Sequence, residues 1–476
     1  MSHRNKQEED YPTSLSRRCL LFLGPAVLSS WREPSLAVPS SSQFAPTTSN
    51  VLESITMPLL WNGAAYCIYY RVDGTLFRAV VDSGSPFLMI PGSCATVIRQ
   101  RWGCYKYQGV STDLEPSIEV YDGKEGLVTW RKANSFYFEN ATVGNALGYE
   151  QATPALQATL FQTHSNRFGA SGLSFGVASE SLIGSPGGIF LGLVKNRDAR
   201  IRPTFLEQSK IVAFEFNFGG RSPMPEGRVG SDDVSVDDAP NGVGSLSNLT
   251  LYTVPRVLAK AGGDFIPLSR DLRKLGDPTQ HYAAIASSLV VNGVTLVGST
   301  GGGTSDIAAA IADPAKAGES ICGPGYSQPC SSSFATSKPM LLGFTGDRRP
   351  IYAIIDTGVT GMVLDRELFN KRYAIARQRR EANLWGRVTV SFRTHQRKTI
   401  ELTANSPVTT PIAEIPWKNF KGHLVVIGLA FLEGCSLNVD IDEDRLWIEE
   451  LRQQRPDSPS YFIPKARVFN SRSGVA

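Results

Sequence analysis

The chain contains one short pattern twice, and this repeat restricts its possible folds more than any other feature. Residues 78–91 read RAVVDSGSPFLMIP, and residues 352–364 read YAIIDTGVTGMVL. An apolar run bounded by turn residues predicts a buried strand. The Asp-Ser/Thr-Gly that follows predicts a tight turn, because Gly adopts backbone conformations closed to other residues. The repeat therefore predicts two rigid turns, each presenting one carboxylate, Asp82 and Asp356.

Each Asp is followed later in the chain by a second matching element. Residues 190–193 read FLGL and residues 426–429 read VIGL. Two unrelated turns in a β protein are the simplest alternative. That alternative explains neither the pairing nor the shared order of the elements, so we favour two related halves that each contribute one Asp.

This arrangement resembles the pepsin-like aspartic proteases, in which two lobes each supply one Asp to a shared site. The family motif is apolar-apolar-Asp-Thr/Ser-Gly-Ser/Thr, with an apolar-apolar-Gly element later in each lobe. The resemblance extends from about Met57 to Glu450. It implies a mainly β, bilobal fold of two related β-barrel-like lobes with the active-site cleft between them. It also implies an aspartic endopeptidase that works at acidic to mildly acidic pH.

With this resemblance the chain divides into five segments. They are a probable export signal at 1–37, an N-terminal lobe at 52–221, an interlobe linker at 222–262, a C-terminal lobe at 263–452 and a polar tail at 453–476.

The resemblance also assigns roles to individual residues. Asp82 and Asp356 would be catalytic, and Ser83 and Thr357 would brace the two turns against each other. Ser85 would donate a hydrogen bond to Asp82. The remaining substrate-binding candidates are Gly84, Gly358 and Tyr121.

Tyr121 belongs to a predicted hairpin at 118–126, with Gly at its tip. In the resembled family a mobile flap hairpin covers the cleft and carries a Tyr two strand positions before the turn. An ordinary surface hairpin is the alternative.

Two positions depart from the family pattern. Val359 stands where the second turn usually has a hydroxyl, and Met89 stands where a Trp usually partners the flap Tyr. Neither change removes a catalytic atom, so we expect activity with an altered pH range. A pepsin-fold binding or inhibitor protein without turnover is the alternative function.

Composition excludes several other classes. The formal net charge is only +4 over 476 residues, so nothing indicates a nucleic-acid partner. We find no Cys/His spacing typical of a metal site. The expected partners are protein or peptide substrates, with no cofactor, no permanent membrane anchor and a monomeric state.

The N-terminal segment and the cysteines both favour export. Arg17 and Arg18 precede a short apolar run at 19–28 and a small-x-small exit at 35–37, which are the parts of an export signal. A twin-arginine-like signal to a plastid thylakoid lumen and a disordered tail remain alternatives to the secretory pathway, with an extracellular or vacuolar destination.

Removal of Cys19 with the signal leaves six of the seven cysteines. The family commonly closes a small disulfide loop just after the first turn, which implies a Cys94–Cys104 bond. Cys322 and Cys330 form a second close pair, and Cys67 could meet Cys435.

Overall fold

The computed structural model describes residues 52–451 except for several internal gaps. The gaps are 107–109, 113, 122–123, 146–147, 152, 159, 161–171, 180–181, 183–188, 196–203, 221–246, 256–262, 278, 299–348, 413–414, 416 and 418–419. The predicted export signal, the polar tail, Cys322 and Cys330 lie outside the described residues. The fold is mainly β, as the sequence predicts, and the described residues form four sheets.

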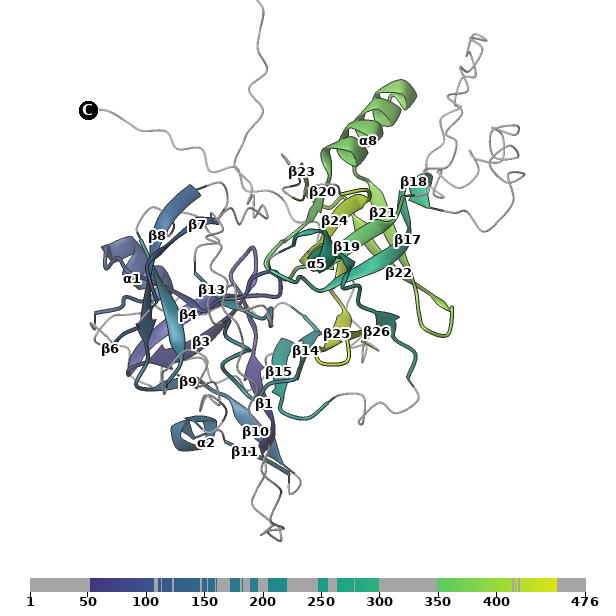
Figure 1. The fold of residues 1–476 in the computed structure, drawn as a ribbon. Helices are drawn as coiled ribbons and strands as arrows, with labels where there is room; N and C mark the ends of the chain where they lie inside the picture. The colour runs from purple at the N-terminus through teal and green to yellow at the C-terminus, as the bar shows by residue number, and fades with distance from the viewer. Residues whose placement is uncertain are drawn as a thin grey trace, which may run out of the picture.

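The shared sheet has eight strands in the order β11–β10–β1–β15–β14–β25–β26–β16, taken from the start, the middle and the end of the described chain (Figure 1). These strands are β1 Leu52–Pro58, β10 Thr142–Asn145, β11 Gly148–Gln151, β14 Ala213–Phe218, β15 Ser247–Tyr252, β16 Ile266–Pro267, β25 Cys435–Asp440 and β26 Arg445–Glu450. β15 lies within the segment 222–262 that the sequence predicted as a linker, so this connection contains a strand.

The first-loop sheet carries the first Asp turn and has the order β13–β4–β3–β2, with β9 paired to β3. Its strands are β2 Leu60–Trp61, β3 Tyr66–Val72, β4 Thr75–Asp82, β9 Phe136–Phe138 and β13 Phe190–Gly192. One face of β4 is buried through Phe77, Ala79 and Val81, all 0% exposed. The period of two along β4 fixes which face packs on the core.

The hairpin sheet has the order β5–β12–β8–β6, with β7 paired to β8. Its strands are β5 Met89–Pro91, β6 Val110–Ser111, β7 Ser117–Tyr121, β8 Lys124–Lys132 and β12 Ser174–Ala178.

The second-loop sheet carries the second Asp turn and has the order β22–β21–β17–β19–β24–β20–β23, with β18 paired to β17. Its strands are β17 Ala283–Val291, β18 Val294–Gly298, β19 Ile351–Ile355, β20 Met362–Leu364, β21 Arg387–Arg393, β22 Thr399–Asn405, β23 Thr409–Pro411 and β24 His423–Ile427. All five residues of β19 are buried, which explains the unbroken apolar run before Asp356.

The part of the chain that the structure describes contains few helices. They are α1 Thr96–Trp102, α2 Pro154–Ala158, α5 Asp271–Leu275, α8 Arg366–Arg379 and the 3-10 turn η3 Leu429–Phe431. Asp365 caps α8 by accepting a hydrogen bond from Leu368 N. Among the described residues, no helix has the length and apolarity needed to cross a membrane.

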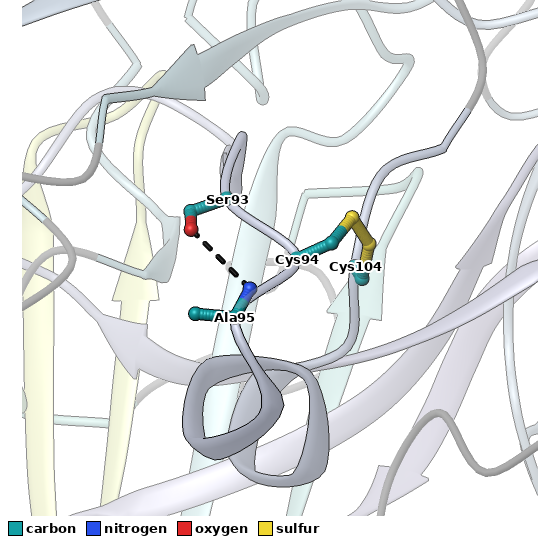
Figure 2. The surroundings of a disulfide bond; sticks show 4 residues. All are labelled: Ser93, Cys94, Ala95 and Cys104. Atoms are coloured by element: carbon teal, nitrogen blue, oxygen red, sulfur yellow. Dashed lines mark hydrogen bonds between the residues drawn. A yellow bond between two sulfur atoms is a disulfide. The ribbon is translucent and has the colours of Figure 1, made fainter.

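The cysteines next to α1 form the predicted disulfide. Cys94 and Cys104 are bonded, with their Cα atoms 5.0 Å apart, and the bond closes the segment that contains α1 (Figure 2). The predicted Cys67–Cys435 pairing is wrong, since neither residue is in a disulfide. Cys67 lies within β3, opposite Val80 of the first-loop sheet, whereas Cys435 begins β25 of the shared sheet, opposite Glu450.

Candidate active site

The two Asp turns are built in the same way. β4 ends at Asp82, and β19 ends one residue before Asp356. In the first turn Gly84 N donates to Asp82 Oδ1 at 2.9 Å, and in the second Gly358 N donates to Asp356 Oδ1 at 2.8 Å. Each carboxylate is therefore fixed by the backbone of its own turn, two residues further on.

The two turns are bonded to each other by a reciprocal set of hydrogen bonds. Ser83 N donates to Thr357 Oγ1 and Thr357 N donates to Ser83 Oγ, both at 3.0 Å. Ser83 Oγ then donates to Ile355 O at 3.0 Å, and Thr357 Oγ1 donates to Val81 O at 2.9 Å. Both hydroxyl residues are 1% exposed. Because these groups are buried, losing any one hydroxyl leaves buried polar partners unsatisfied.

This bracing brings the second carboxylate against the first turn. A Cβ atom placed on Gly84 would lie 2.5 Å from Asp356 Cγ. No residue other than Gly fits at this position without moving Asp356. Asp82 is 3% exposed, and its Oδ2 accepts a hydrogen bond from Ser85 Oγ at 2.9 Å. The two carboxyl groups are thus held around one short loop, Asp82 by its bonds to Gly84 N and Ser85 Oγ and Asp356 against Gly84.

The two later Gly elements lie against these turns in matching ways. Gly192 N donates to Phe87 O at 2.7 Å, and Gly428 N donates to Gly361 O at 2.9 Å. A Cβ on Gly192 would meet Ser85 O and Phe87 O, and a Cβ on Gly428 would meet Val359 O and Gly361 O. The glycines are needed for the close approach of backbone to backbone. In each half of the chain, the Gly element that follows the Asp thus lies directly against the Asp turn.

Both departures from the family pattern are buried. Val359 is 5% exposed and packs in a cluster with Val363, Trp417 and Val426. Met89 is 0% exposed, and its Sδ would lie 2.5 Å from a Cβ on Gly176 of β12. Each apolar side chain thus has a packing environment of its own.

The predicted hairpin is present as β7 and β8. Tyr121 is the last residue of β7 and is paired with Lys124, and residues 122 and 123 between them lie outside the described residues. Of Tyr121 the structure describes the backbone only.

The two faces of this hairpin differ. Val128 and Trp130 on one face are 0% and 2% exposed, while the cross-strand pair Ile118 and Leu127 on the other is 60% and 45% exposed. Trp130 contacts Phe87 of the first turn, with ring centroids 4.9 Å apart, and its Nε1 donates to Ser117 Oγ at 3.1 Å. The base of the hairpin is therefore packed on the first Asp turn.

Tyr282 is a further connection between the two turns, and sequence reasoning missed it. Its hydroxyl donates to Leu193 O at 2.7 Å and accepts from Lys195 N at 3.1 Å. Its carbonyl oxygen accepts a hydrogen bond from Ile355 N at 3.1 Å. A Tyr just before a strand is too common a feature to signal this role from sequence alone.

A buried Asp–His pair precedes Tyr282. Asp277 Oδ2 lies 2.9 Å from His281 Nδ1 and also accepts from His281 N, while Asp277 Oδ1 accepts from Thr279 N at 3.0 Å. Burial alone would raise the pKa of Asp277, but the His281 ring and the backbone donors outweigh burial and hold that pKa below its ordinary value. The carboxylate therefore fixes the turn that leads into Tyr282.

No group of three or more His, Cys, Asp or Glu side chains suited to a metal ion occurs in the described part of the chain. No model of a known protein family matches the chain, and no curated protein matches its sequence.

Proposed function

We propose that this chain is a two-lobed aspartic endopeptidase that hydrolyses peptide bonds with a water molecule activated by Asp82 and Asp356. The observation that carries the proposal is the reciprocal bonding of Ser83 and Thr357, which holds both Asp turns together in one buried framework. A fold that only needed two surface turns would have no reason to bury four hydrogen bonds between them.

In the proposed arrangement the first-loop and hairpin sheets form one lobe and the second-loop sheet forms the other, with the shared sheet joining them. In Figure 1, β3, β4 and β8 lie to the left, β17, β19 and β24 to the right, and β14, β15 and β25 between. The peptide would lie in extended form between the lobes, under the β7–β8 hairpin, with apolar side chains on either side of the cleaved bond.

The proposed chemistry needs one ionised and one protonated carboxyl group. The ionised Asp takes a proton from water as the water oxygen attacks the peptide carbonyl carbon, and the protonated Asp gives its proton to the carbonyl oxygen. In the resulting tetrahedral diol, the leaving nitrogen accepts the proton that the first Asp took from water, and the C–N bond breaks. One hydroxyl of the diol gives its proton back to the other Asp, which leaves a carboxylic acid and an amine. This two-carboxylate scheme is the general chemistry of aspartic proteases, in which one proton is shared between two neighbouring Asp side chains.

Replacing each Asp separately tests the proposal. Asp82→Asn and Asp356→Asn keep the shape of the side chains but remove one proton-transfer role each, so both should abolish cleavage of a denatured protein at acidic pH. Asp271→Asn is the matched control, because Asp271 pairs with Lys274 on α5, at the surface. Near wild-type cleavage in either turn variant would overturn the proposal.

A peptidic transition-state inhibitor distinguishes the alternative. A wild-type protein that binds the inhibitor but cleaves no peptide would be a pepsin-fold binding protein. An endopeptidase, by contrast, should bind the inhibitor and lose peptide cleavage in proportion to the fraction of protein with inhibitor bound.

We also propose that the protein is exported. The Cys94–Cys104 bond supports this, since structural disulfides persist in oxidising compartments.

A further inference from the structure

The β7–β8 hairpin contains a buried carboxylate of its own, Glu119. This residue is 6% exposed, is paired with Gly126 across the hairpin and lies two strand positions before Tyr121. Because side chains alternate along a strand, Glu119 shares a face with Ser117 and not with the exposed Ile118. The two-carboxylate chemistry proposed for the Asp turns does not use this group.

Glu119 is the end of a chain of two hydrogen bonds. Trp130 Nε1 donates to Ser117 Oγ at 3.1 Å, and Ser117 Oγ donates to Glu119 Oε1 at 2.7 Å. An indole N–H can only donate and an ionised carboxylate can only accept, so the Ser117 hydroxyl accepts from Trp130 and donates to Glu119. Each of the three side chains is therefore oriented by its neighbour in the chain.

The other end of this hydrogen-bond chain lies on the first Asp turn. The indole of Trp130 is 2% exposed and meets the ring of Phe87 edge-on, with the ring centroids 4.9 Å apart. Phe87 comes two residues after Ser85, which donates to Asp82 Oδ2. The carbonyl oxygen of Phe87 accepts from Gly192 N at 2.7 Å, so Phe87 is itself fixed in the turn. The chain thus links the hairpin to the turn that presents Asp82.

Stability alone does not explain a carboxylate at this position. The same face of the hairpin carries Val128 and Trp130, which are 0% and 2% exposed. Burial of a carboxylate beside such residues costs free energy that burial of an apolar side chain does not. A satisfied buried polar network instead selects one arrangement of its members. An apolar side chain in place of Glu119 would therefore keep the hairpin folded but lose the fixed orientation of the indole.

We propose that Glu119 and Ser117 are positioning residues, which act through Trp130 to hold the β7–β8 hairpin in one orientation over the first Asp turn. That the hairpin covers a peptide rests on the proposed endopeptidase function, whereas the positioning of the hairpin does not. A hairpin without this hold covers the peptide less of the time. Since the hairpin residues concerned touch no reacting atom, the loss should appear in KM and not in kcat.

The positioning is tested without substrate, by hydrogen exchange of the full-length protein measured by mass spectrometry. Glu119→Met removes the acceptor, and Ser117→Ala removes the hydroxyl. Both should speed the exchange of segment 117–132 about tenfold, since one charge-assisted hydrogen bond is lost. The exchange of β17 and the midpoint of urea unfolding should stay unchanged. Glu119→Gln should exchange like the wild type, because its amide oxygen still accepts from Ser117.

Glu125→Met is the control, since it makes the same substitution in the same hairpin. Glu125 is exposed and lies opposite Val120, on the face that carries Ile118 and Leu127. This variant should exchange like the wild type. Unchanged exchange of the hairpin in Glu119→Met, or equal acceleration in Glu119→Gln or Glu125→Met, would overturn the proposal.

The kinetic consequence is tested with a peptide substrate at acidic pH. Glu119→Met and Ser117→Ala should raise KM about tenfold and leave kcat within about twofold. Ser117→Thr, which keeps the hydroxyl, should leave both constants near their wild-type values. A wild type that cleaves no peptide contradicts the proposed function, and the exchange experiment still decides the positioning. An unchanged KM in the two variants whose hairpin exchanges faster would show that the hairpin is not positioned for the substrate.

Discussion

Ser83 and Thr357 each donate a backbone N–H to the other's side-chain hydroxyl, at 3.0 Å in both directions. This exchange ties together two turns that the sequence separates widely, and it makes the hydroxyl groups interdependent. Ser83→Ala leaves Thr357 N and Ile355 O without their partner, and Thr357→Val does the same to Ser83 N and Val81 O.

Each of these two substitutions should therefore lower the free energy of unfolding by about 1–3 kcal/mol. The double variant should lose clearly less free energy of unfolding than the sum of the two single losses, because both substitutions act on one hydrogen-bond network. Urea unfolding of the four proteins measures the coupling, and Thr357→Ser, which keeps the hydroxyl, is the control. If the two single losses in free energy of unfolding simply add in the double variant, the two turns are held independently.

In the proposed endopeptidase, Val359→Thr should shift the pH–rate profile of peptide cleavage toward acid. A hydroxyl that donates to a carboxylate favours the ionised form of that carboxylate. Ser85 Oγ donates such a bond in the first turn, and Val359 offers none in the second. A dyad with such a donor keeps one ionised member at lower pH, so activity extends further in the acid direction. The measurement is kcat/KM against pH for both proteins.

Val363→Thr is the control for that experiment. Val363 packs in the same apolar cluster as Val359 but lies in β20, outside the Asp turn. The Val363→Thr substitution introduces the same hydroxyl group and should leave the pH–rate profile unchanged. An unmoved or alkaline-shifted profile in Val359→Thr would contradict the argument.

The Asp277–His281 pair should make stability depend on pH. The pKa of Asp277 is lowered in the folded protein, so the unfolded chain binds a proton more readily. Its stabilising contribution is complete above the unfolded pKa of about 3.9 and is lost as pH falls through the folded pKa. Urea unfolding from neutral to strongly acidic pH should show this loss.

Asp277→Asn should remove most of that dependence and lower the free energy of unfolding at neutral pH by about 1–3 kcal/mol, since it weakens the buried hydrogen bonds that Thr279 and His281 make to the carboxylate. If the variant and the wild type lose stability in parallel as the pH falls, Asp277 is not the group responsible.

Loss of the Cys94–Cys104 bond should lower the free energy of unfolding by about 3 kcal/mol on the loop-entropy model, given the sequence separation of 10. The variant is Cys94→Ser with Cys104→Ser, and Cys435→Ser controls for loss of a thiol outside a disulfide. Mass spectrometry of protein isolated without reductant should find the crosslink. Free thiols at both positions would argue against export.

The sequence predicted the features that depend on local pattern. The Asp turns and the 118–126 hairpin each have distinct apolar runs and turn residues, and both are present. Pairings between distant strands were harder to predict. β15 reads SNLTLY in a polar neighbourhood, and Cys67 and Cys435 lie in different sheets, which spacing does not reveal. Tyr282 acts through a hydroxyl and a carbonyl whose partners are fixed only by the assembled fold.

The strand order of the shared sheet also determines when β14 can complete its pairings during translation. β14 pairs on one side with β15 and on the other with β25, so Phe216 lies opposite Leu437. A ribosome releases the β25 partner of β14 only when nearly the whole described chain has been synthesised. Until then this strand edge is open to pairing with other chains. Nascent chains that end before Cys435 should therefore depend on chaperones, and premature termination should yield insoluble protein rather than a folded first half.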